Sequence, residues 1–350
     1  MPGDGIGVEV IDACVSVLDV VQRRSGVELA FDRLDAGALH YKATGSALPD
    51  ETFRRASEAD AILLGAMGWP EIRYPDGTEI APQLDLRFRL GLYAGVRPIR
   101  ALPGMPLALA DERAKNIDFV LIRESTEGLF ASRDKGEVID DREARDTQVI
   151  TREVCERLFD FSFGLAADRR KRGHRGHVTC VDKANVFRSF AFFRRVFDER
   201  AARNPGLGRS HQYVDACALD MVRRPWDYDV LVTENMFGDI LSDLAAGLVG
   251  GMGFAPSADI GDKNAVFQPS HGTAPDIAGR GKANPIATFL SAALMLRWLG
   301  DRHADAAATT AAERLEKAVD AALGSCTVLP FDAGGRDGTF AMTKAVIEHL

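Results

Sequence analysis

The sequence predicts an α/β protein with a mostly parallel central sheet flanked by helices. Short apolar runs typical of buried strands alternate along the chain with longer stretches at helical spacing, which is the order expected for strands joined by crossover helices. With 350 residues and 46% apolar content, the chain is long enough for one large or two medium domains with hydrophobic cores.

The first hundred residues contain two expected helices and two expected strands. Apolar residues at helical spacing predict a helix over residues 7–25 that Gly26 ends, and a second helix is expected over 50–58. Residues 27–34 alternate apolar and polar side chains as a strand does, and residues 61–65 form a short apolar run typical of a buried strand.

The rest of the chain continues the alternation. Strands are expected over 117–122, 177–181 and 228–232, and helices over 151–172, from about 186 and from about 237. Pro98 with the loop at 101–106, and the glycine-rich segment 250–253, are candidate hinges. We therefore expect residues 98–250 to form a central domain, with residues 1–97 and 251–350 together forming the other.

Composition excludes several classes of function. The net charge of −8 and the pI of about 5.5 would repel a phosphate backbone, which argues against nucleic acid as a partner. The sequence contains neither an apolar run of membrane-spanning length nor a signal-peptide pattern at its start. Five scattered cysteines without a C-x-x-C pair fit a reducing compartment. We expect a cytoplasmic protein with no membrane contact.

Asp239 and Asp243 are candidate metal ligands. On a helix they stand at positions i and i+4, on one face, where two carboxylates repel each other unless a cation or water separates them. Oxygen ligands of this kind suit Mg²⁺ or Mn²⁺ rather than zinc. The alternative is that both are ordinary carboxylates near a helix N-terminus, where the helix dipole favours them.

Arg87, Arg97 and Arg123 form a second candidate set. Arg123 ends the strand that begins near 117, and the ends of parallel strands point into ligand crevices. Arginine forks bind carboxylates with two hydrogen bonds, so three converging arginines would indicate a substrate with at least two carboxylates. The alternative is that each is a surface ion-pair partner.

Two further segments carry candidate functional residues. Lys183 follows the strand at 177–181, where a desolvated lysine could act as a base, although a solvated loop lysine is the simpler interpretation. The segment 271–279 is rich in turn formers whose backbone amides could approach a phosphate, and Asp276 could accept hydrogen bonds from an adenosine ribose and repel a 2′-phosphate. The glycines at 3–7 do not form a Rossmann fingerprint, because only two residues precede them and the fingerprint follows a strand.

In combination these segments resemble the isocitrate and isopropylmalate dehydrogenase family of β-decarboxylating dehydrogenases. The resemblance spans nearly the whole chain, through GDGIGVEV at 3–10, LLGAMG at 63–68, LDLRFRLGLYAGVRP at 84–98, RESTEGLF at 123–130, VDKANVFR at 181–188, HQYVDA at 211–216, TENMFGDILSD at 233–243 and HGTAPDIAGRGKANP at 271–285. It implies the two-domain fold of isopropylmalate dehydrogenase, which is not a Rossmann fold, with 1–97 plus 251–350 on the cofactor side and 98–250 carrying the metal and the dimer contact.

The resemblance also implies roles for individual residues. The three arginines would bind the malate part of the substrate. Asp239 and Asp243 of one subunit would hold the metal together with Asp215 of its partner, and Lys183, also from the partner, would assist removal of the hydroxyl proton. The implied unit is a homodimer with shared sites. Contacts to the dinucleotide would come from Asn235, His271, Gly272, Thr273, Ala274, Asp276 and Asn284. Asp276 favours NAD, because family members that use NADP carry a basic residue there.

The chain departs from the family pattern at two places. Phe130 stands where a tyrosine is expected as proton donor after decarboxylation, and a phenyl ring donates no proton. This suggests weak decarboxylation, or oxidation without it, unless water or a neighbouring group substitutes. The family also begins with a strand ahead of GDGIG, whereas here the loop follows Met1 and Pro2 directly. A missing first strand would leave a sheet edge unpaired, so we expect low stability or poor solubility for the chain as given.

The substrate remains open between several 2-hydroxy di-acids. In this family the residues just before the first arginine select the substituent, and here they include polar Gln83 and apolar Leu84. We place 3-isopropylmalate first, with tartrate or D-malate as the alternative. A catalytically impaired paralogue acting as a binding or regulatory subunit would fit Phe130 alone, and an ordinary Rossmann 2-hydroxyacid dehydrogenase would predict no metal dependence.

Overall fold

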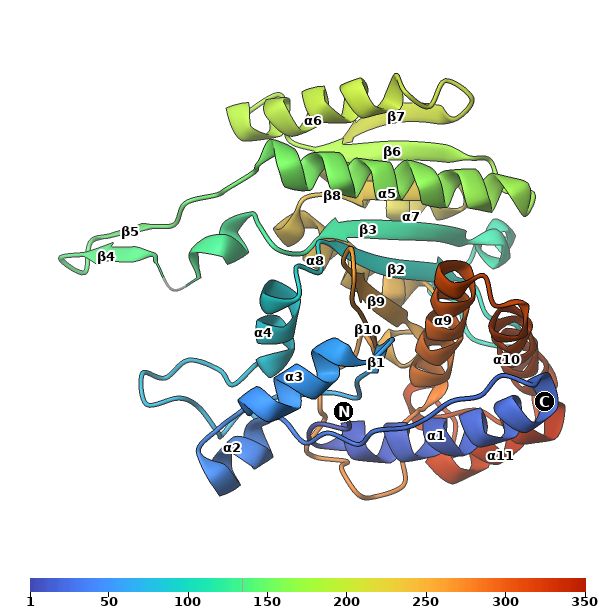
Figure 1. The fold of residues 1–350 in the computed structure, drawn as a ribbon. Coiled ribbons are helices and arrows are strands. Elements are labelled where there is room, and N and C mark those ends of the chain that lie inside the picture. Colours follow the sequence, from blue (N-terminus) through green and yellow to red (C-terminus); the bar gives the residue numbers. More distant parts are fainter. Residues whose placement is uncertain (134) are drawn as a thin grey trace.

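One mixed sheet forms the centre of the molecule (Figure 1). The computed structural model describes residues 1–133 and 135–350, and in this part of the chain the sheet has eight strands in the order β1–β10–β9–β2–β3–β8–β6–β7. Their bounds are β1 Ile62–Leu63, β2 Ala94–Arg100, β3 Asp118–Glu124, β6 His177–Asp182, β7 Gly208–Tyr213, β8 Val230–Thr233, β9 Pro256–Ile260 and β10 Ala265–Pro269.

Strand direction divides the sheet into two regions. Strands β3, β8, β6 and β7 are parallel neighbours, and β1 is parallel to β10. Strands β10, β9, β2 and β3 are antiparallel neighbours, with Val96 opposite both Ala258 and Ile122. The short connection between β9 and β10 accounts for part of this, because such a hairpin makes consecutive strands antiparallel. The expected α/β class with a mostly parallel sheet is confirmed.

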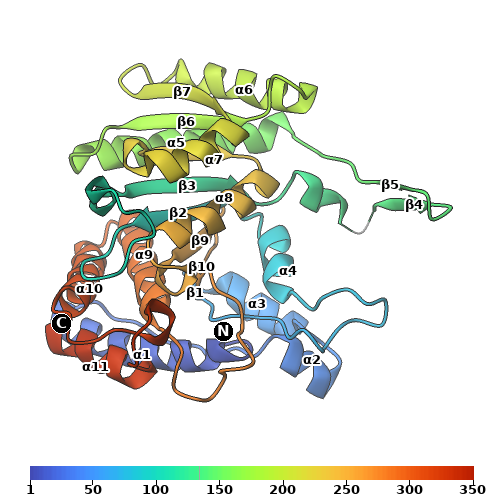
Figure 2. The same ribbon diagram turned by 180° about the vertical axis from the view of Figure 1, so that it is seen from behind.

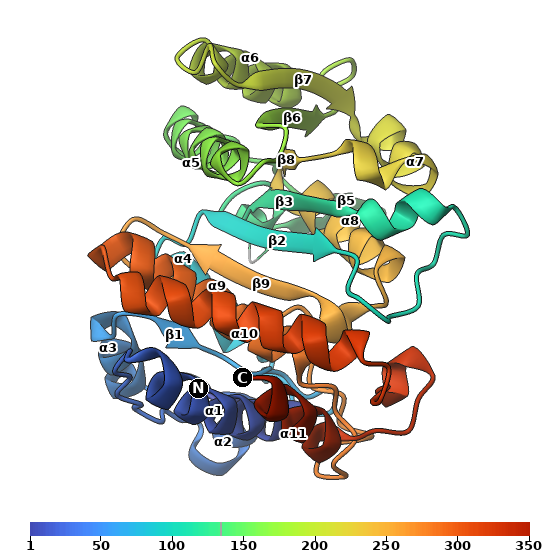
Figure 3. The same ribbon diagram turned by 90° about the vertical axis from the view of Figure 1, so that its right-hand side faces the viewer.

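Helices cover both faces of the sheet (Figures 2 and 3). Helices α5, α9 and α10 lie on one face, and α4, α7 and α8 lie on the other. The helix bounds are α1 Ile6–Ser25, α2 Ala38–Thr44, α3 Asp50–Glu58, α4 Pro82–Arg89, α5 Arg152–Lys171, α6 Arg188–Ala201, α7 Val214–Arg223, α8 Asn235–Leu248, α9 Ile286–His303, α10 Ala306–Gly324 and α11 Thr339–His349. None of the helices in the described ranges is both long enough and apolar enough to span a bilayer.

Local signals explain where several helices begin and end. Gly26 follows α1 in the left-handed conformation that glycine adopts without strain. The Thr151 hydroxyl accepts a hydrogen bond from the amide of Val154 and so caps α5. At α8 the Glu234 carboxylate accepts from the amides of Met236 and Phe237. The predicted helices at the first two places are confirmed, and α8 begins two residues before the expected position.

The expected strand over residues 27–34 is wrong. The segment forms no strand, and its alternation does not give one buried face: Val27 and Leu34 are buried, but Phe31 is 47% exposed. A strand needs a neighbouring chain to satisfy its ladder hydrogen bonds. Between this segment and β1 lies instead a groove of about 740 Å³, lined by Val27, Leu29 and Ile62 among others.

The first three residues lie alongside β1 and continue past its end. The Met1 ammonium donates to the carbonyl of Leu63 at 2.8 Å, the amide of Gly65 donates to the Met1 carbonyl at 3.0 Å, and Gly3 forms a parallel bridge with Ala66. These residues form no full strand, but they partly fill the sheet edge that was expected to be unpaired. The expected low stability stays a prediction.

A two-stranded hairpin extends from the body of the molecule. Its strands are β4 Glu137–Ile139 and β5 Glu143–Arg145, and it projects to one side of the sheet (Figure 1). Val138 on this arm is largely exposed, although most apolar side chains lie in the cores on the two faces of the sheet. The hairpin contributes little to those cores.

Candidate active site

The three predicted arginines come together on one face of the sheet. Arg87 belongs to α4, Arg97 to β2 and Arg123 to the end of β3. Alternation along each strand directs Arg97 and Arg123 to the face covered by α4 and α8. Their exposed fractions are only 6%, 6% and 4%. The interpretation as surface ion-pair partners is therefore wrong.

A buried carboxylate that the sequence analysis did not select lies among these arginines. Asp259 on β9 is 2% exposed. Its Oδ2 accepts from Arg87 Nη2 at 3.1 Å and from Gln268 Nε2 at 3.1 Å, and its Oδ1 accepts from Arg97 Nη2 at 3.5 Å. The signal available in the sequence is a single acidic residue within the apolar run 256–260, a position that a strand keeps only when the charge has partners.

Arg123 connects the arginine cluster to α8. Its Nε donates to Asn235 Oδ1 at 2.8 Å, and its Nη1 contacts the carboxylate of Asp239. Burial and the neighbouring Arg87 lower the pKa of Arg123 to about 10, although Asp239 acts in the opposite direction. Gly238 makes this approach possible, because a Cβ there would lie 2.7 Å from Arg123 Cβ and Cγ.

The two candidate metal ligands on α8 lie beside this cluster. Asp239 and Asp243 are one helical turn apart, and burial together with the negative charge of Asp239 raises the pKa of Asp243. Such mutual repulsion is what a bound cation would relieve, so the pair fits a divalent metal. Across residues 1–133 and 135–350, however, no three acidic, histidine or cysteine side chains gather as a complete metal site.

Lys183 and Asp215 are brought together with each other but not with Asp239 and Asp243. Lys183 Nζ lies 2.5 Å from Asp215 Oδ1 at the start of α7. This hydrogen bond is the main cause that lowers the pKa of Asp215. Among the described residues, Asp215 does not gather with Asp239 and Asp243 into a group that could hold a metal. Within one chain the predicted site is therefore divided into two halves.

Phe130 lies next to the arginine cluster. The guanidinium carbon of Arg123 is 5.1 Å from the centre of the Phe130 ring, within the range of a cation–π contact. The residue that replaces the expected tyrosine thus faces the site.

The candidate cofactor loop packs against the start of α1. The amide of Ile6 donates to the Thr273 carbonyl at 2.8 Å, and Gly5 leaves no room for a Cβ against that same carbonyl. His271 Nε2 is buried without a hydrogen-bond partner among the described residues, and burial lowers the pKa of this imidazole. Gly272 and Asp276 are exposed, and Ala274 has a positive φ. An orphaned nitrogen beside open glycine backbone fits a polar ligand.

The two predicted asparagines are buried and already bonded within the chain. Asn235 donates to the Glu127 carbonyl at 2.9 Å in addition to holding Arg123. Asn284 donates to the Asp332 carboxylate at 3.1 and 3.2 Å. Asn235 therefore positions Arg123, and Asn284 positions the carboxylate of Asp332.

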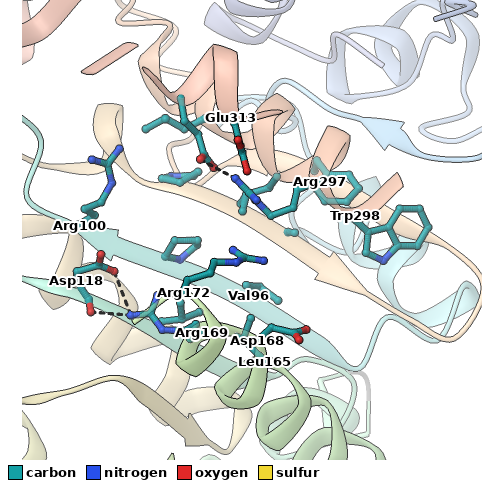
Figure 4. Close-up of a pocket in the computed structure, with 18 of the residues that line it drawn as sticks. Val96, Arg100, Asp118, Leu165, Asp168, Arg169, Arg172, Arg297, Trp298 and Glu313 are labelled. Atoms are coloured by element: carbon teal, nitrogen blue, oxygen red, sulfur yellow. Dashed lines mark hydrogen bonds and ion pairs between the residues drawn. The ribbon is translucent and has the colours of Figure 1, made fainter. Parts of the chain in front are cut away.

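A second large cavity lies on the opposite face of the sheet (Figure 4). It measures about 730 Å³ and lies between α5 and helices α9 and α10, with Val96, Val120 and Ala258 on its floor. These residues alternate with Arg97, Arg123 and Asp259, so they point away from the arginine cluster. A paired Arg100–Asp320 contact at 2.8 and 2.9 Å borders this cavity.

Comparison with known proteins assigns the chain to a family. The model of the isocitrate/isopropylmalate dehydrogenase family matches residues 1–350. The chain belongs to this family. A 3-isopropylmalate/3-methylmalate dehydrogenase of Methanocaldococcus jannaschii is 42% identical over 349 residues, covering 99% of this chain and 97% of that protein. A 3-isopropylmalate dehydrogenase of Heyndrickxia coagulans is 41% identical over 360 residues, covering 100% and 95%.

Solved structures of family members have the same fold. An isocitrate dehydrogenase from Methylococcus capsulatus superimposes with a TM-score of 0.86 at 35% identity, covering 99% of this chain and 97% of that one. A β-decarboxylating dehydrogenase from Thermococcus kodakarensis gives 0.79 at 36% identity, covering 99% and 94%. The family resemblance and the fold predicted from the motifs are confirmed. The chain is an oxidoreductase of the dehydrogenase type.

Proposed function

We propose that this protein oxidises a 3-substituted 2-hydroxy di-acid with NAD and Mg²⁺ or Mn²⁺, with 3-isopropylmalate as the first candidate and β-decarboxylation as the following step. The observation that carries the proposal is the convergence of three buried arginines beside the acidic pair of α8. Buried guanidinium groups bind carboxylates strongly because little water competes for them. The names of the relatives support the same choice.

The protein's own groups do not satisfy every donor of the arginine cluster. Arg87 Nε is buried and lacks a hydrogen-bond partner within the described ranges, and Arg87 and Arg97 share the single carboxylate of Asp259. We call the cluster of Arg87, Arg97 and Arg123 the anion pocket. Asn235 holds the Arg123 guanidinium at the junction between this cluster and Asp239. In this arrangement the arginines would orient the carbon chain and place the 2-hydroxyl near the acidic pair.

Asp239 and Asp243, with Asp215 of a second subunit, would hold the divalent cation. The chemistry that such a cation would supply is stabilisation of negative charge at the 2-hydroxyl oxygen of the substrate. Lys183, bonded to Asp215, would assist removal of the hydroxyl proton, which requires that it reach the site from the partner together with Asp215. Hydride acceptance is the chemistry that NAD would supply.

The cofactor would lie along the loop from His271 to Asp276. Gly272 is open, so backbone amides can approach a phosphate group, and the orphaned His271 Nε2 offers a further polar contact. Exposed Asp276 would repel the 2′-phosphate of NADP, which supports NAD.

A homodimer would bring the two halves of the site together. Exposed apolar side chains gather on the helices that carry the acidic residues, with Leu219 of α7 56% exposed and Ile240 of α8 62% exposed. Ile240 directly follows Asp239, so a partner that covered this face would lie close to the acidic pair. The projecting β4–β5 hairpin offers a second contact surface.

The 3-substituent of the substrate would meet α4. Gln83 and Leu84 stand one turn before Arg87, and Gln83 Oε1 is buried with no hydrogen-bond partner among the described residues. An unpaired buried oxygen favours a substituent that can donate a hydrogen bond, while Leu84 favours an alkyl group. This mixed pocket keeps tartrate, which carries a 3-hydroxyl, and D-malate as alternative substrates.

The test is a screen for NADH formation with 3-isopropylmalate, isocitrate, homoisocitrate, D-malate and tartrate, with and without Mn²⁺. We expect metal-dependent NADH formation that is fastest with 3-isopropylmalate, and chelation with EDTA should abolish it. Activity with tartrate or D-malate alone would favour the alternative, in which Phe130 limits decarboxylation. No activity with any of the five would overturn the proposal in favour of a binding or regulatory role.

A further inference from the structure

Asp259 occupies a place in the anion pocket that a substrate carboxylate could otherwise take. Its two oxygens receive hydrogen bonds from Arg87, Arg97 and Gln268, at 3.1, 3.5 and 3.1 Å. The side chain is almost fully buried, so water does not screen its charge from the arginines. The site therefore contains a permanent carboxylate before any substrate arrives.

The charge of Asp259 persists despite its burial. Burial by itself raises the pKa of this carboxyl, but Arg87, Arg97 and Arg123 together outweigh it and hold the pKa below its ordinary value. At neutral pH the carboxylate therefore cancels one of the three guanidinium charges. The two charges that remain match a substrate with two carboxylates.

A third substrate carboxylate would meet a less favourable field. The divalent cation proposed between Asp239 and Asp243 would balance the charges of these two carboxylates. This part of the site therefore adds no positive charge that could compensate a third substrate carboxylate. A third carboxylate on the 3-substituent, beside α4, would meet Arg87 with its guanidinium already paired with Asp259, so its charge would not be compensated. Like charges within a few ångströms in a buried site repel strongly.

We propose that Asp259 determines the charge class of the substrate, by making the site select 2-hydroxy dicarboxylates with an uncharged 3-substituent and disfavour tricarboxylates such as isocitrate. This inference rests on the proposed function, because it concerns the same anion pocket. Neighbouring residues keep Asp259 in place. Gly95 on β2 lies close to the carboxylate, since a Cβ there would be 3.2 Å from Asp259 Oδ1 and 2.6 Å from Ser125 Oγ.

The main test is Asp259→Asn, which removes the charge with almost no change of shape. We expect the ratio of kcat/KM for isocitrate to kcat/KM for 3-isopropylmalate to rise roughly tenfold or more, given the size of charge–charge interactions in a buried site. Asp259→Ser removes the same charge with a smaller side chain and should shift the ratio in the same direction. Unchanged ratios in both variants would overturn the inference.

A matched control comes from a second buried ion-paired aspartate. Asp229 accepts from Arg169 Nε at 2.6 Å far from the anion pocket, so Asp229→Asn also removes the charge of a buried aspartate that is paired with an arginine. We expect this variant to lose thermal stability while its ratio of kcat/KM values stays that of the wild type. A shift as large as that of Asp259→Asn would show that selectivity follows general destabilisation, and would overturn the inference.

Binding of unreactive anions separates this inference from the proposed function. Succinate and propane-1,2,3-tricarboxylate have two and three carboxylates and no hydroxyl to oxidise, so their Kd values can be measured by calorimetry without turnover. We expect the wild type to prefer succinate and Asp259→Asn to lose or reverse that preference. If the wild type oxidised none of the hydroxy acids, the proposed function would fail, yet this comparison would still decide the role of Asp259.

Discussion

Phe130 stands where the family resemblance leads us to expect a tyrosine. Its ring lies against Arg123, so the position faces the arginine cluster and is not a remote substitution. An aromatic ring can pack against a guanidinium but cannot protonate the enolate that decarboxylation leaves. The hydroxyl of a tyrosine at this position would restore a donor while keeping the ring contact.

We expect Phe130→Tyr to raise the amount of CO2 released per NADH formed. General acid catalysis contributes about 10²–10⁴-fold, so the decarboxylation step should gain up to that factor if no other group protonates the product. The measurement is CO2 release and NADH formation in the same assay, for both proteins. Equal stoichiometry in wild type and variant would mean that water or another residue already supplies the proton.

Asp276 allows a test of cofactor choice at a single position. The side chain is exposed at the end of the candidate cofactor loop, so its replacement should disturb packing little. We expect Asp276→Lys to raise kcat/KM with NADP relative to NAD by roughly 10- to 100-fold. The substitution replaces repulsion between residue 276 and the 2′-phosphate of NADP with attraction, a change of a few kcal/mol. Asp301, exposed at the far end of α9, provides the matched Asp301→Lys control, and an equal shift there would argue against a local effect.

At the level of elements, the packing of α8 on β3 determines where the acidic pair lies. Gly238 brings the helix backbone against the aliphatic part of the Arg123 side chain. Glu234 caps the helix, and the next residue, Asn235, accepts a hydrogen bond from the Arg123 guanidinium. The helix start, the arginine and Asp239 are therefore placed by one contact. Any side chain at Gly238 would separate them.

We expect Gly238→Ala to destabilise the protein by about 1–3 kcal/mol through overpacking, and to raise KM for the di-acid by displacing Arg123. The matched control is Gly247→Ala on the same helix, where a Cβ would meet no atom within 4 Å among the described residues. That variant should be neutral or stabilising by about 0.5–1 kcal/mol, because alanine favours the helix. Urea unfolding and steady-state kinetics would measure both effects, and equal behaviour of the two variants would contradict this account.

The end of β3 also carries a prediction about pH. Burial raises the pKa of Glu124 from 4.5 to about 7, even though the amides of Thr126 and Glu127 stabilise its charged form. Between these values the folded chain holds a proton that the unfolded chain has released, so stability is lost as the pH rises through this window. The slope from this group is about 1.4 kcal/mol per pH unit at most.

Glu124→Gln should therefore flatten the dependence of the unfolding free energy on pH between about 5 and 7, where the wild type loses stability. The measurement is urea unfolding at several pH values, compared with Glu137→Gln on the exposed hairpin. If the wild-type slope survived in Glu124→Gln, the proton uptake would belong to another group.

At the level of the whole molecule, the residues of the candidate site form two separate groups within one chain. Lys183 and Asp215 form one half, and Arg123, Asp239 and Asp243 form the other. The exposed apolar faces of α7 and α8 suggest how a second copy could join them. A site completed in this way would exist only in the dimer.

Mixing two inactive variants would test this arrangement. Lys183→Ala and Asp239→Asn should each abolish NADH formation, and after subunit exchange their mixture should recover about a quarter of wild-type activity, since half of the random dimers would carry one intact site. Asp239→Asn mixed with Asp243→Asn is the control, because both changes affect the same half. Failure of the first pair to recover activity, with exchange verified, would place Lys183 and Asp239 in one subunit.

Sequence periodicity was sufficient for the elements whose signals are local. The helices over 7–25, 50–58 and 151–172 match α1, α3 and α5 closely, because apolar spacing and residues such as Gly26 and Thr151 act within a few positions. Motif order was likewise sufficient for the family, and it selected three arginines that the structure brings together. Residues 27–34 were predicted wrongly from their alternation. An alternating segment becomes a strand only if another strand lies beside it, and here a groove lies beside it instead.

The sequence by itself thus determined the α/β class, the family and the residue types from which the site is built. Only the tertiary structure decided that Asp259 lies between Arg87 and Arg97, that Phe130 touches Arg123, and that Lys183 bonds Asp215 away from Asp239. The physical reason is that helix periodicity and capping depend on neighbours within a turn, whereas these contacts join positions up to 172 residues apart. Strand register and helix packing establish such contacts, and neither can be read from local spacing.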